Sequence, residues 1–171
     1  MQIQRTKYDA TARSYLARSG HYLNNPPPGA LFAIGVFEDV DGLFGVVAGR
    51  LIGLCLIGRP VARMLPQDGS VGEVTRMVLD SGLPYGTASA VLREAIAVAA
   101  KRRMTRLIAY HDRTRHTGCI YRKSGFRKDG TTAPSATGWA SRKRPKSADA
   151  GSTSKRRWSI EIQQPPAPQP R

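Results

Sequence analysis

The sequence predicts an α/β (α+β) fold in which helices flank a mixed central sheet. Two observations favour it. Short runs rich in β-branched and apolar residues, typical of strands, fill most of the first half of the chain. The second half then alternates strand, long amphipathic helix, strand and helix. Hydrophobic residues make up 40% of the 171 residues, which is enough for one core.

The first half is expected to begin with a short helix over residues 10–18, capped by Asp9. A proline-rich extended loop follows this helix. Three strands come next, with a turn wherever glycine punctuates the pattern. In chain order these are the strand Leu31–Phe37, the turn Asp39–Gly42, the strand Leu43–Ala48, the hairpin turn Gly49–Arg50 and the strand Leu51–Ile57.

The second half is expected to hold two strand–helix pairs. Alternation along the first strand predicts that Glu73 and Arg76 lie on opposite faces of the sheet. The first helix begins at Thr87 and carries an apolar stripe, while basic residues gather at its end, where they suit the helix dipole. The four elements are the strand Val71–Leu79, the helix Thr87–Arg103, the strand Leu107–Tyr110 and the helix Thr114–Ser124.

Residues 1–140 are predicted to form one domain, and residues 141–171 a basic, Pro-rich, disordered tail. The chain has 27 Lys and Arg against 12 Asp and Glu, a net charge of +15. The segment from Ser141 onward accounts for +6, so the remainder carries +9. A surface this basic predicts a polyanionic partner such as nucleic acid. The alternative is that the charge serves only solubility.

No charged-then-apolar leader and no membrane-length apolar run is apparent in the sequence. Cys55 and Cys119 lack metal-ligand spacing, and reduced thiols are expected for both. We therefore expect a cytoplasmic protein with no membrane partner.

The stretch Leu107–Phe126 carries the chemistry most clearly. Tyr121 lies just past a strand end, where ligands of α/β sheets tend to bind, and Gly125 follows as a helix terminator. A phenol with a pKa near 10 arrives protonated, so Tyr121 could act as a general acid. The alternative is a tyrosine that only packs at the edge of the core.

The element order and the Tyr-x-x-x-Gly-Phe exit resemble the GNAT acyltransferase fold. In that family a glycine-rich loop at a helix N-terminus holds the pyrophosphate of coenzyme A. The resemblance implies a cofactor site at Gly86, Thr87, Ala88 and Ser89 and a donor that is acetyl-coenzyme A or a related molecule. Leu83 stands where the family has Gln or Arg.

A narrower resemblance is to the phage Mu Mom family of GNAT-like DNA-modification proteins. It rests on the pieces SGHYLN (19–24), FAIGV (32–36), IGRPVAR (57–63), EVTRMVLD (73–80) and TGWASRKRPK (137–146). The resemblance implies that a carbamoylmethyl group is added to the exocyclic amine of adenine in phage DNA, which protects that DNA from restriction. It also implies a phage or prophage product, acting in the host cytoplasm.

The same resemblance makes His21 and Tyr22 active-site residues. His21 has the pKa of a general base, and Tyr22 could stack on an extruded base. Asp112 could orient His21, or it could cap the next helix. The Mom family also implies a possible iron site, for which the candidate ligands are His21, Tyr22 and Asp112.

Contacts to double-stranded DNA are expected from arginines near the site and from basic and aromatic residues of the tail. Trp158 is expected to stack on bases in the same way. The other candidates are Arg59, Arg63, Arg76, Trp139, Arg142, Lys143, Arg144 and Lys146.

The sequence therefore predicts a DNA adenine-modifying transferase. Two other functions remain open: a GNAT N-acetyltransferase acting on a protein, a small amine or aminoacyl-tRNA, and a non-catalytic DNA-binding module. A homodimer is possible, and the sequence leaves the oligomeric state open.

Overall fold

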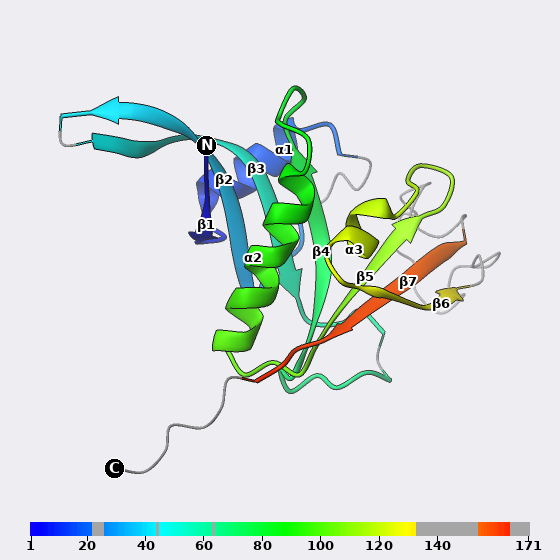
Figure 1. The fold of residues 1–171 in the computed structure, drawn as a ribbon. Helices are drawn as coiled ribbons and strands as arrows, with labels where there is room; N and C mark the ends of the chain where they lie inside the picture. Colours follow the sequence, from blue (N-terminus) through cyan, green and yellow to red (C-terminus); the bar gives the residue numbers. More distant parts are fainter. Residues whose placement is uncertain (22–25, 44, 63, 133–153, 165–171) are drawn as a thin grey trace, which may run out of the picture.

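The computed structural model describes residues 1–21, 26–43, 45–62, 64–132 and 154–164. A mixed seven-stranded sheet runs in the order β1-β2-β3-β4-β5-β7-β6, with α1 on one face and α2 and α3 on the other (Figure 1). Only β4 and β5 pair in parallel among the described strands. The elements are β1 (Gln2–Thr6), α1 (Ala10–Arg18), β2 (Phe32–Gly42), β3 (Gly45–Gly58), β4 (Val71–Leu79), α2 (Thr87–Lys101), β5 (Arg106–Asp112), α3 (Cys119–Lys123), β6 (Arg127–Thr132) and β7 (Lys155–Glu161).

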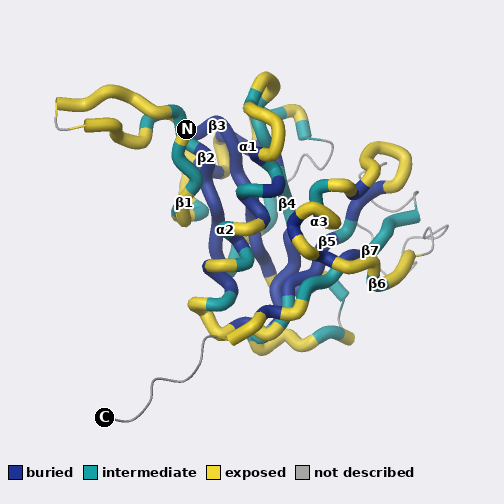
Figure 2. The backbone as a smooth tube through the Cα atoms, in the orientation of Figure 1, coloured by how far each residue is buried: buried dark blue, intermediate teal, exposed yellow. Residues whose placement is uncertain are grey.

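Each face of the sheet has its own apolar core, and the central strands between them are largely buried (Figure 2). The helix α2 buries Val91, Leu92 and Ala95 against one face, as its helical spacing predicts. On the other face α1 buries Ala12, Tyr15 and Leu16 against a smaller cluster. The Asp9 carboxylate accepts a hydrogen bond from the Ala12 N–H at 3.1 Å, which confirms the expected cap of α1.

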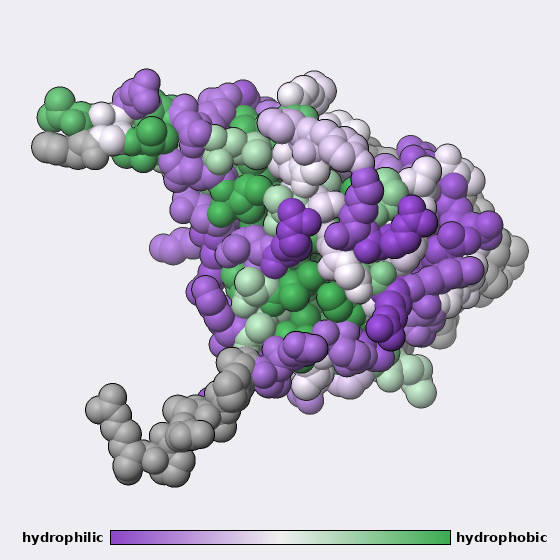
Figure 3. Space-filling view, in the orientation of Figure 1, coloured by the Kyte–Doolittle hydropathy of each residue, from purple (hydrophilic) through white to green (hydrophobic). Residues whose placement is uncertain are grey.

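The two turns predicted around residues 39–50 are wrong. The strands β2 and β3 form one long hairpin that projects from the body, and the reversal lies between Gly42 and Gly45 (Figures 1 and 3). Gly45 has a φ of +121°, so the positive-φ residue of this reversal is a glycine. At Gly49 and Arg50 the register between the strands shifts, and the backbone pairing resumes where Asp39 pairs with Ala48, so an irregularity in the ladder stands where a turn was predicted.

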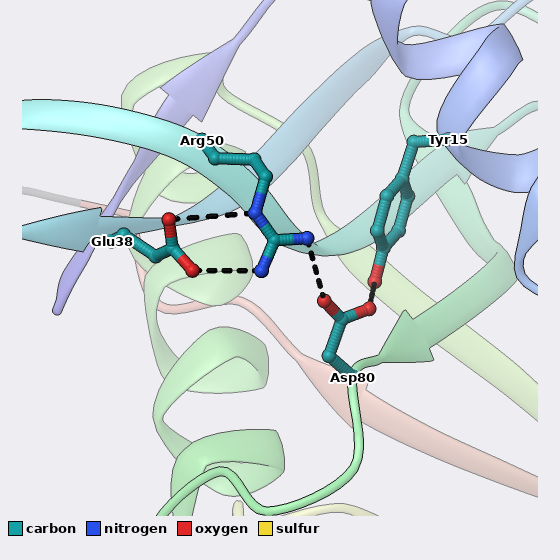
Figure 4. Close-up of polar contacts among 4 residues, drawn as sticks. All are labelled: Tyr15, Glu38, Arg50 and Asp80. Carbon is teal, nitrogen blue, oxygen red and sulfur yellow. Dashed lines mark hydrogen bonds and ion pairs between the residues drawn. The ribbon is translucent and has the colours of Figure 1, made fainter.

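A polar cluster ties the base of this hairpin to α1 and to the end of β4 (Figure 4). The Arg50 guanidinium donates to the Glu38 carboxylate at 2.7 Å and lies 3.6 Å from the Asp80 carboxylate. The buried Tyr15 hydroxyl donates to the same Asp80 carboxylate at 2.8 Å. Burial and this hydrogen bond raise the pKa of Tyr15 well above its usual value, so the phenol stays neutral.

The prediction of a disordered tail over 141–171 is wrong for residues 155–161, which form β7 inside the sheet. The strand pairs antiparallel with β5 on one side and with β6 on the other. It is held there because Trp158 and Ile162 bury their side chains in the core. The domain therefore extends past residue 140 to include this strand. Residues 133–153, which precede it, lie outside the described residues.

A bulge in β4 overturns the prediction that Glu73 and Arg76 lie on opposite faces. Leu56 of β3 pairs with Arg76, but the next residue, Ile57, pairs with Val74, so Thr75 is extra. An extra residue reverses the alternation of side chains. Glu73 and Arg76 consequently share the α1-side face of the sheet.

The last helix is also shorter than predicted, since α3 covers only Cys119–Lys123. Gly118, with a φ of +76°, precedes its first residue. The residues from Arg113 to Thr117 form turns and loop instead.

Candidate functional site

A cavity of about 620 Å³ opens where β4 and β5 separate. Residues Val71–Val74 of β4 pair with Arg106–Ala109 of β5, and beyond these residues the two strands diverge (Figure 1). The helix α3 lies beside the gap, and described residues of four further segments contribute to its wall: His21, Val61–Ala62, Thr132 and Lys155. Divergence of two parallel strands at their carboxyl ends is a common origin of ligand sites in α/β folds.

Tyr121 of α3 lines this cavity, as the sequence predicts, and it also packs in the core. Its ring lies 5.9 Å from that of Trp158 and 5.7 Å from that of Phe126. Both interpretations of Tyr121 from the sequence are therefore compatible with its position: the aromatic contacts fix the ring, and its surface still faces the cavity.

His21 and Arg76 line the same cavity from distant parts of the chain. His21 follows α1 and is partly exposed, whereas Arg76 comes from β4 just after the bulge. The Arg76 guanidinium donates to the Thr75 carbonyl oxygen at 2.6 Å. The fold thus brings together three residues that the sequence singled out separately, while Tyr22 lies outside the described residues.

Glu73 is a buried carboxyl in the cavity wall, and we did not predict a role for it in the site. It accepts a hydrogen bond from the Val61 N–H at 2.9 Å. Burial raises its pKa, and the Val61 hydrogen bond and the charges of Lys155 and Arg76 oppose that rise. A charged residue inside an apolar strand was the sequence signal for it.

Comparison with known protein families identifies the family of the chain. The profile of the Mom protein family matches residues 2–164. The chain belongs to the Mom protein family. No curated protein matches the sequence.

Solved structures similar to this Mom-family chain are acetyltransferases. An IAA acetyltransferase from Bacillus cereus is 15% identical, with a TM-score of 0.61 over 94% of this chain and 99% of that one. The Escherichia coli ribosomal-protein-S18-alanine N-acetyltransferase is 11% identical, with a TM-score of 0.61 and coverages of 99% and 98%. A Bacillus subtilis acetyltransferase in complex with CoA is 13% identical, with a TM-score of 0.61 and coverages of 95% and 99%. At these identities the likeness shows the fold, which is that of the GNAT acetyltransferases.

The predicted cofactor loop begins α2 in this Mom-family chain. Gly86 has a φ of +92° and lies directly before the helix. The Thr87 and Ser89 side chains are buried, and the Thr87 hydroxyl donates to the Pro84 carbonyl at 2.7 Å. The first N–H groups of an α-helix have no partner within the helix, so this loop offers backbone donors. Leu83 packs against the core, which is compatible with its apolar character.

The cofactor loop lies next to α3 and therefore next to Tyr121. The Ser124 hydroxyl contacts the Ser89 carbonyl at 3.4 Å, and Lys123 donates a hydrogen bond to the hydroxyl of the exposed Tyr85. This hydrogen bond to Tyr85 raises the pKa of the exposed Lys123 ammonium group. The short helix α3 thus connects the loop at the start of α2 to the cavity.

Asp112 does not line the cavity, although it is buried. Its carboxylate accepts from the Thr114 N–H at 2.9 Å and from the Thr114 hydroxyl at 2.7 Å. It stabilises the turn after β5, close to the capping role considered from the sequence, although no helix begins there.

The described part of the chain gives no support to the iron site that the family resemblance implied. Among the described residues, no group of three or more His, Cys, Asp or Glu side chains is close enough to hold a metal ion. Of the three candidate ligands, His21 lines the cavity, Asp112 stabilises its own turn and Tyr22 lies outside the described residues.

Of the predicted DNA contacts, Arg76 lines the cavity. Arg59 is exposed but does not line the cavity, and Trp158 is buried in the core rather than available to stack on bases. The remaining candidates lie outside the described residues: Arg63, Trp139, Arg142, Lys143, Arg144 and Lys146. In the part of the chain that the structure describes, no helix has the length and apolarity to cross a membrane.

Proposed function

We propose that this Mom-family protein transfers a group, by resemblance a carbamoylmethyl group, to the exocyclic amine of adenine in double-stranded DNA. The observation that carries the proposal is the gathering of His21, Arg76 and Tyr121 in one cavity. The product would protect the DNA from restriction enzymes. Groups in and around the cavity could bind a donor, bind an adenine base and carry out the two proton transfers.

The donor side of the proposal rests on backbone groups. The N-terminus of α2 suits a pyrophosphate, because the N–H groups of its first turn and its dipole both favour an anion, although the Thr87 N–H already donates to the Pro84 carbonyl. No described strand pairs with β4 on the β5 side beyond Val74, so its backbone can bind an extended amide-containing chain as an added strand would. Pyrophosphate and amide groups are two features of coenzyme A, which favours a donor carried on coenzyme A. The bond between the transferred group and the coenzyme A sulfur would break as the new bond to the adenine nitrogen forms.

The acceptor side rests on charge. Between residues 113 and 128 the chain has six Lys and Arg and no Asp or Glu. Arg113 and Arg122 are exposed on the loop and helix that flank the cavity, where Figure 3 shows hydrophilic side chains around α3. A basic rim suits DNA phosphates, and an extruded adenine could then enter the cavity.

The side chains supply proton transfer. In this proposal His21 accepts the proton that the adenine amine loses as it forms its new bond, because an imidazole titrates near neutral pH. Tyr121 gives a proton to the carrier from which the transferred group departs. Arg76 binds a carboxylate or phosphate oxygen in the same cavity.

Digestion of plasmid DNA from cells expressing the protein tests this proposal. DNA from the wild type should resist restriction enzymes whose sites contain adenine, and His21→Ala and Tyr121→Phe should restore cutting. Tyr8→Phe is the matched control, since the Tyr8 hydroxyl contacts only the Pro27 carbonyl among the hydrogen bonds described and lies outside the cavity wall. Full cutting of wild-type DNA, with the protein soluble, contradicts the proposal.

The acetyltransferase fold favours one other candidate, an N-acetyltransferase with a protein or small amine as acceptor. That function predicts an acetylated peptide or amine, with DNA left unmodified and Tyr121→Phe impairing acetylation.

A further inference from the structure

His111 has a tautomer and an orientation that its neighbours determine. It lies near the end of β5, is 4% exposed and lines the cavity. The indole N–H of Trp158, from β7, donates to the Nδ1 atom of His111 at 2.7 Å. An indole nitrogen is a donor only, so Nδ1 carries the lone pair. In the neutral imidazole the proton must then be on Nε2.

Gly118 and Tyr121 confine the same imidazole ring. A Cβ atom at Gly118 would lie 2.6 Å from the Cε1 atom of His111 and 2.8 Å from Trp158. The Tyr121 ring stacks on His111 with centroids 6.1 Å apart and an angle of 21°. Glycine at position 118 therefore permits a contact among β5, β7 and the start of α3 that any other residue would disturb.

The surroundings of His111 also favour its neutral form. Burial lowers its pKa, and the positive charge of Arg156 lowers it further, with Asp112 opposing. Protonation at Nδ1 would in addition break the hydrogen bond from Trp158. The imidazole accordingly keeps one N–H group, on Nε2, and its Nδ1 is occupied by the indole.

We propose that His111 is a substrate-contacting residue, whose Nε2–H group donates a hydrogen bond to the carbonyl oxygen of the group being transferred, and that Trp158 is its positioning residue. This inference rests on the proposed function, since it assumes that the cavity binds a carbonyl-containing donor. A neutral N–H donor in a buried wall polarises a carbonyl oxygen without giving up its proton. Through Trp158, the strand β7, which the sequence predicts as part of a disordered tail, positions a residue of the cavity wall.

Nitrogen-15 NMR of the full-length protein labelled at histidine tests the inference. His111→Gln assigns the His111 signals by removing them. The free protein should show a protonated Nε2 and an unprotonated, hydrogen-bonded Nδ1. Acetyl-coenzyme A should then shift the Nε2–H signal, and coenzyme A without an acyl group should not. A protonated Nδ1, or the same response to both ligands, overturns the inference.

Binding measurements with matched variants separate a contact from a structural role. His111→Leu should lower the preference for acetyl-coenzyme A over coenzyme A by about threefold to tenfold, the worth of one neutral hydrogen bond. His111→Gln, which keeps an N–H donor, should retain most of the preference, and Trp158→Phe should lose part of it while the protein stays folded. An unchanged preference in folded His111→Leu contradicts the contact.

Failure of the proposed function gives a different pattern. If acetyl-coenzyme A shifts the His111 Nε2–H signal and DNA remains unmodified, the contact stands and the adenine acceptor is wrong. If acetyl-coenzyme A does not bind at all, the contact to its carbonyl group is wrong as well.

Discussion

At the scale of single residues, the cavity combines groups whose surroundings push their protonation in stated directions. His111 is held neutral by burial and by nearby positive charge. Glu73 is a carboxyl whose pKa is raised by burial, although Val61, Lys155 and Arg76 partly compensate. Groups with shifted pKa values often gather at functional sites, which adds to the case for this cavity.

The raised pKa of Glu73 predicts how stability depends on pH. The folded protein holds the Glu73 proton more tightly than the unfolded chain does, so this group stabilises the fold below its unfolded-state pKa. That contribution is lost as the pH rises through the folded-state pKa. Relative to Glu73→Gln, the wild type should therefore lose free energy of unfolding as the pH rises from the ordinary glutamate pKa, about 4.3, through the raised folded-state pKa. Denaturant titrations across this range measure it.

Asp68→Asn is the control of opposite sign. The Ser70 hydroxyl and N–H groups hold the pKa of the exposed Asp68 below its usual value. Relative to Asp68→Asn, the wild type should therefore gain stability as the pH rises through the acidic range. The same pH dependence in both comparisons would contradict the assignment for Glu73.

At the scale of elements, the start of α3 is where a glycine decides the packing. Gly118→Ala introduces a residue at a φ of +76° and also drives a methyl group into His111 and Trp158. Gly69→Ala is the matched control, because Gly69 has a φ of +93° and open space around it. We expect Gly118→Ala to cost about 1–3 kcal/mol more than the control in denaturant unfolding. Equal costs would mean that the aromatic contact does not constrain this position.

Much of the fold could be predicted from the pattern of residues. The apolar spacing of Val91, Leu92 and Ala95 predicts α2, and β4 lies where its apolar and β-branched residues place it. The bulge at Thr75 could not be predicted, because register is a property of a pair of strands rather than of either strand alone.

The strand β7 was missed because its three leading basic residues look like part of a solvated tail. After these basic residues come Trp158 and Ile162, which alternate with polar residues. Their buried side chains hold the segment in the sheet. Because this strand was not predicted, the contact between Trp158 and His111 in the cavity wall could not be predicted either, since the two residues are 47 positions apart in the sequence. By contrast, His21, Arg76 and Tyr121 could be singled out before the fold placed them in one cavity.

At the scale of the whole molecule, a net charge of +15 predicts that the proposed binding to duplex DNA depends strongly on salt. Arg113→Glu should weaken binding to duplex DNA by about tenfold at moderate salt and make the salt dependence shallower, because a phosphate contact at the cavity rim becomes repulsive. Arg93→Glu makes the same charge change on the exposed side of α2, away from the cavity, and is the control. Fluorescence anisotropy over a series of salt concentrations measures both, and equal effects would contradict binding at the cavity rim.

Modification of adenine in DNA, as we propose it, changes the mass of one nucleoside. Mass analysis of nucleosides, released from the DNA of cells expressing the full chain, detects this change. We expect a deoxyadenosine carrying the added mass of one carbamoylmethyl group, absent with His21→Ala and with Tyr121→Phe. Unmodified deoxyadenosine alone, from cells in which the wild-type protein is soluble and abundant, would contradict it.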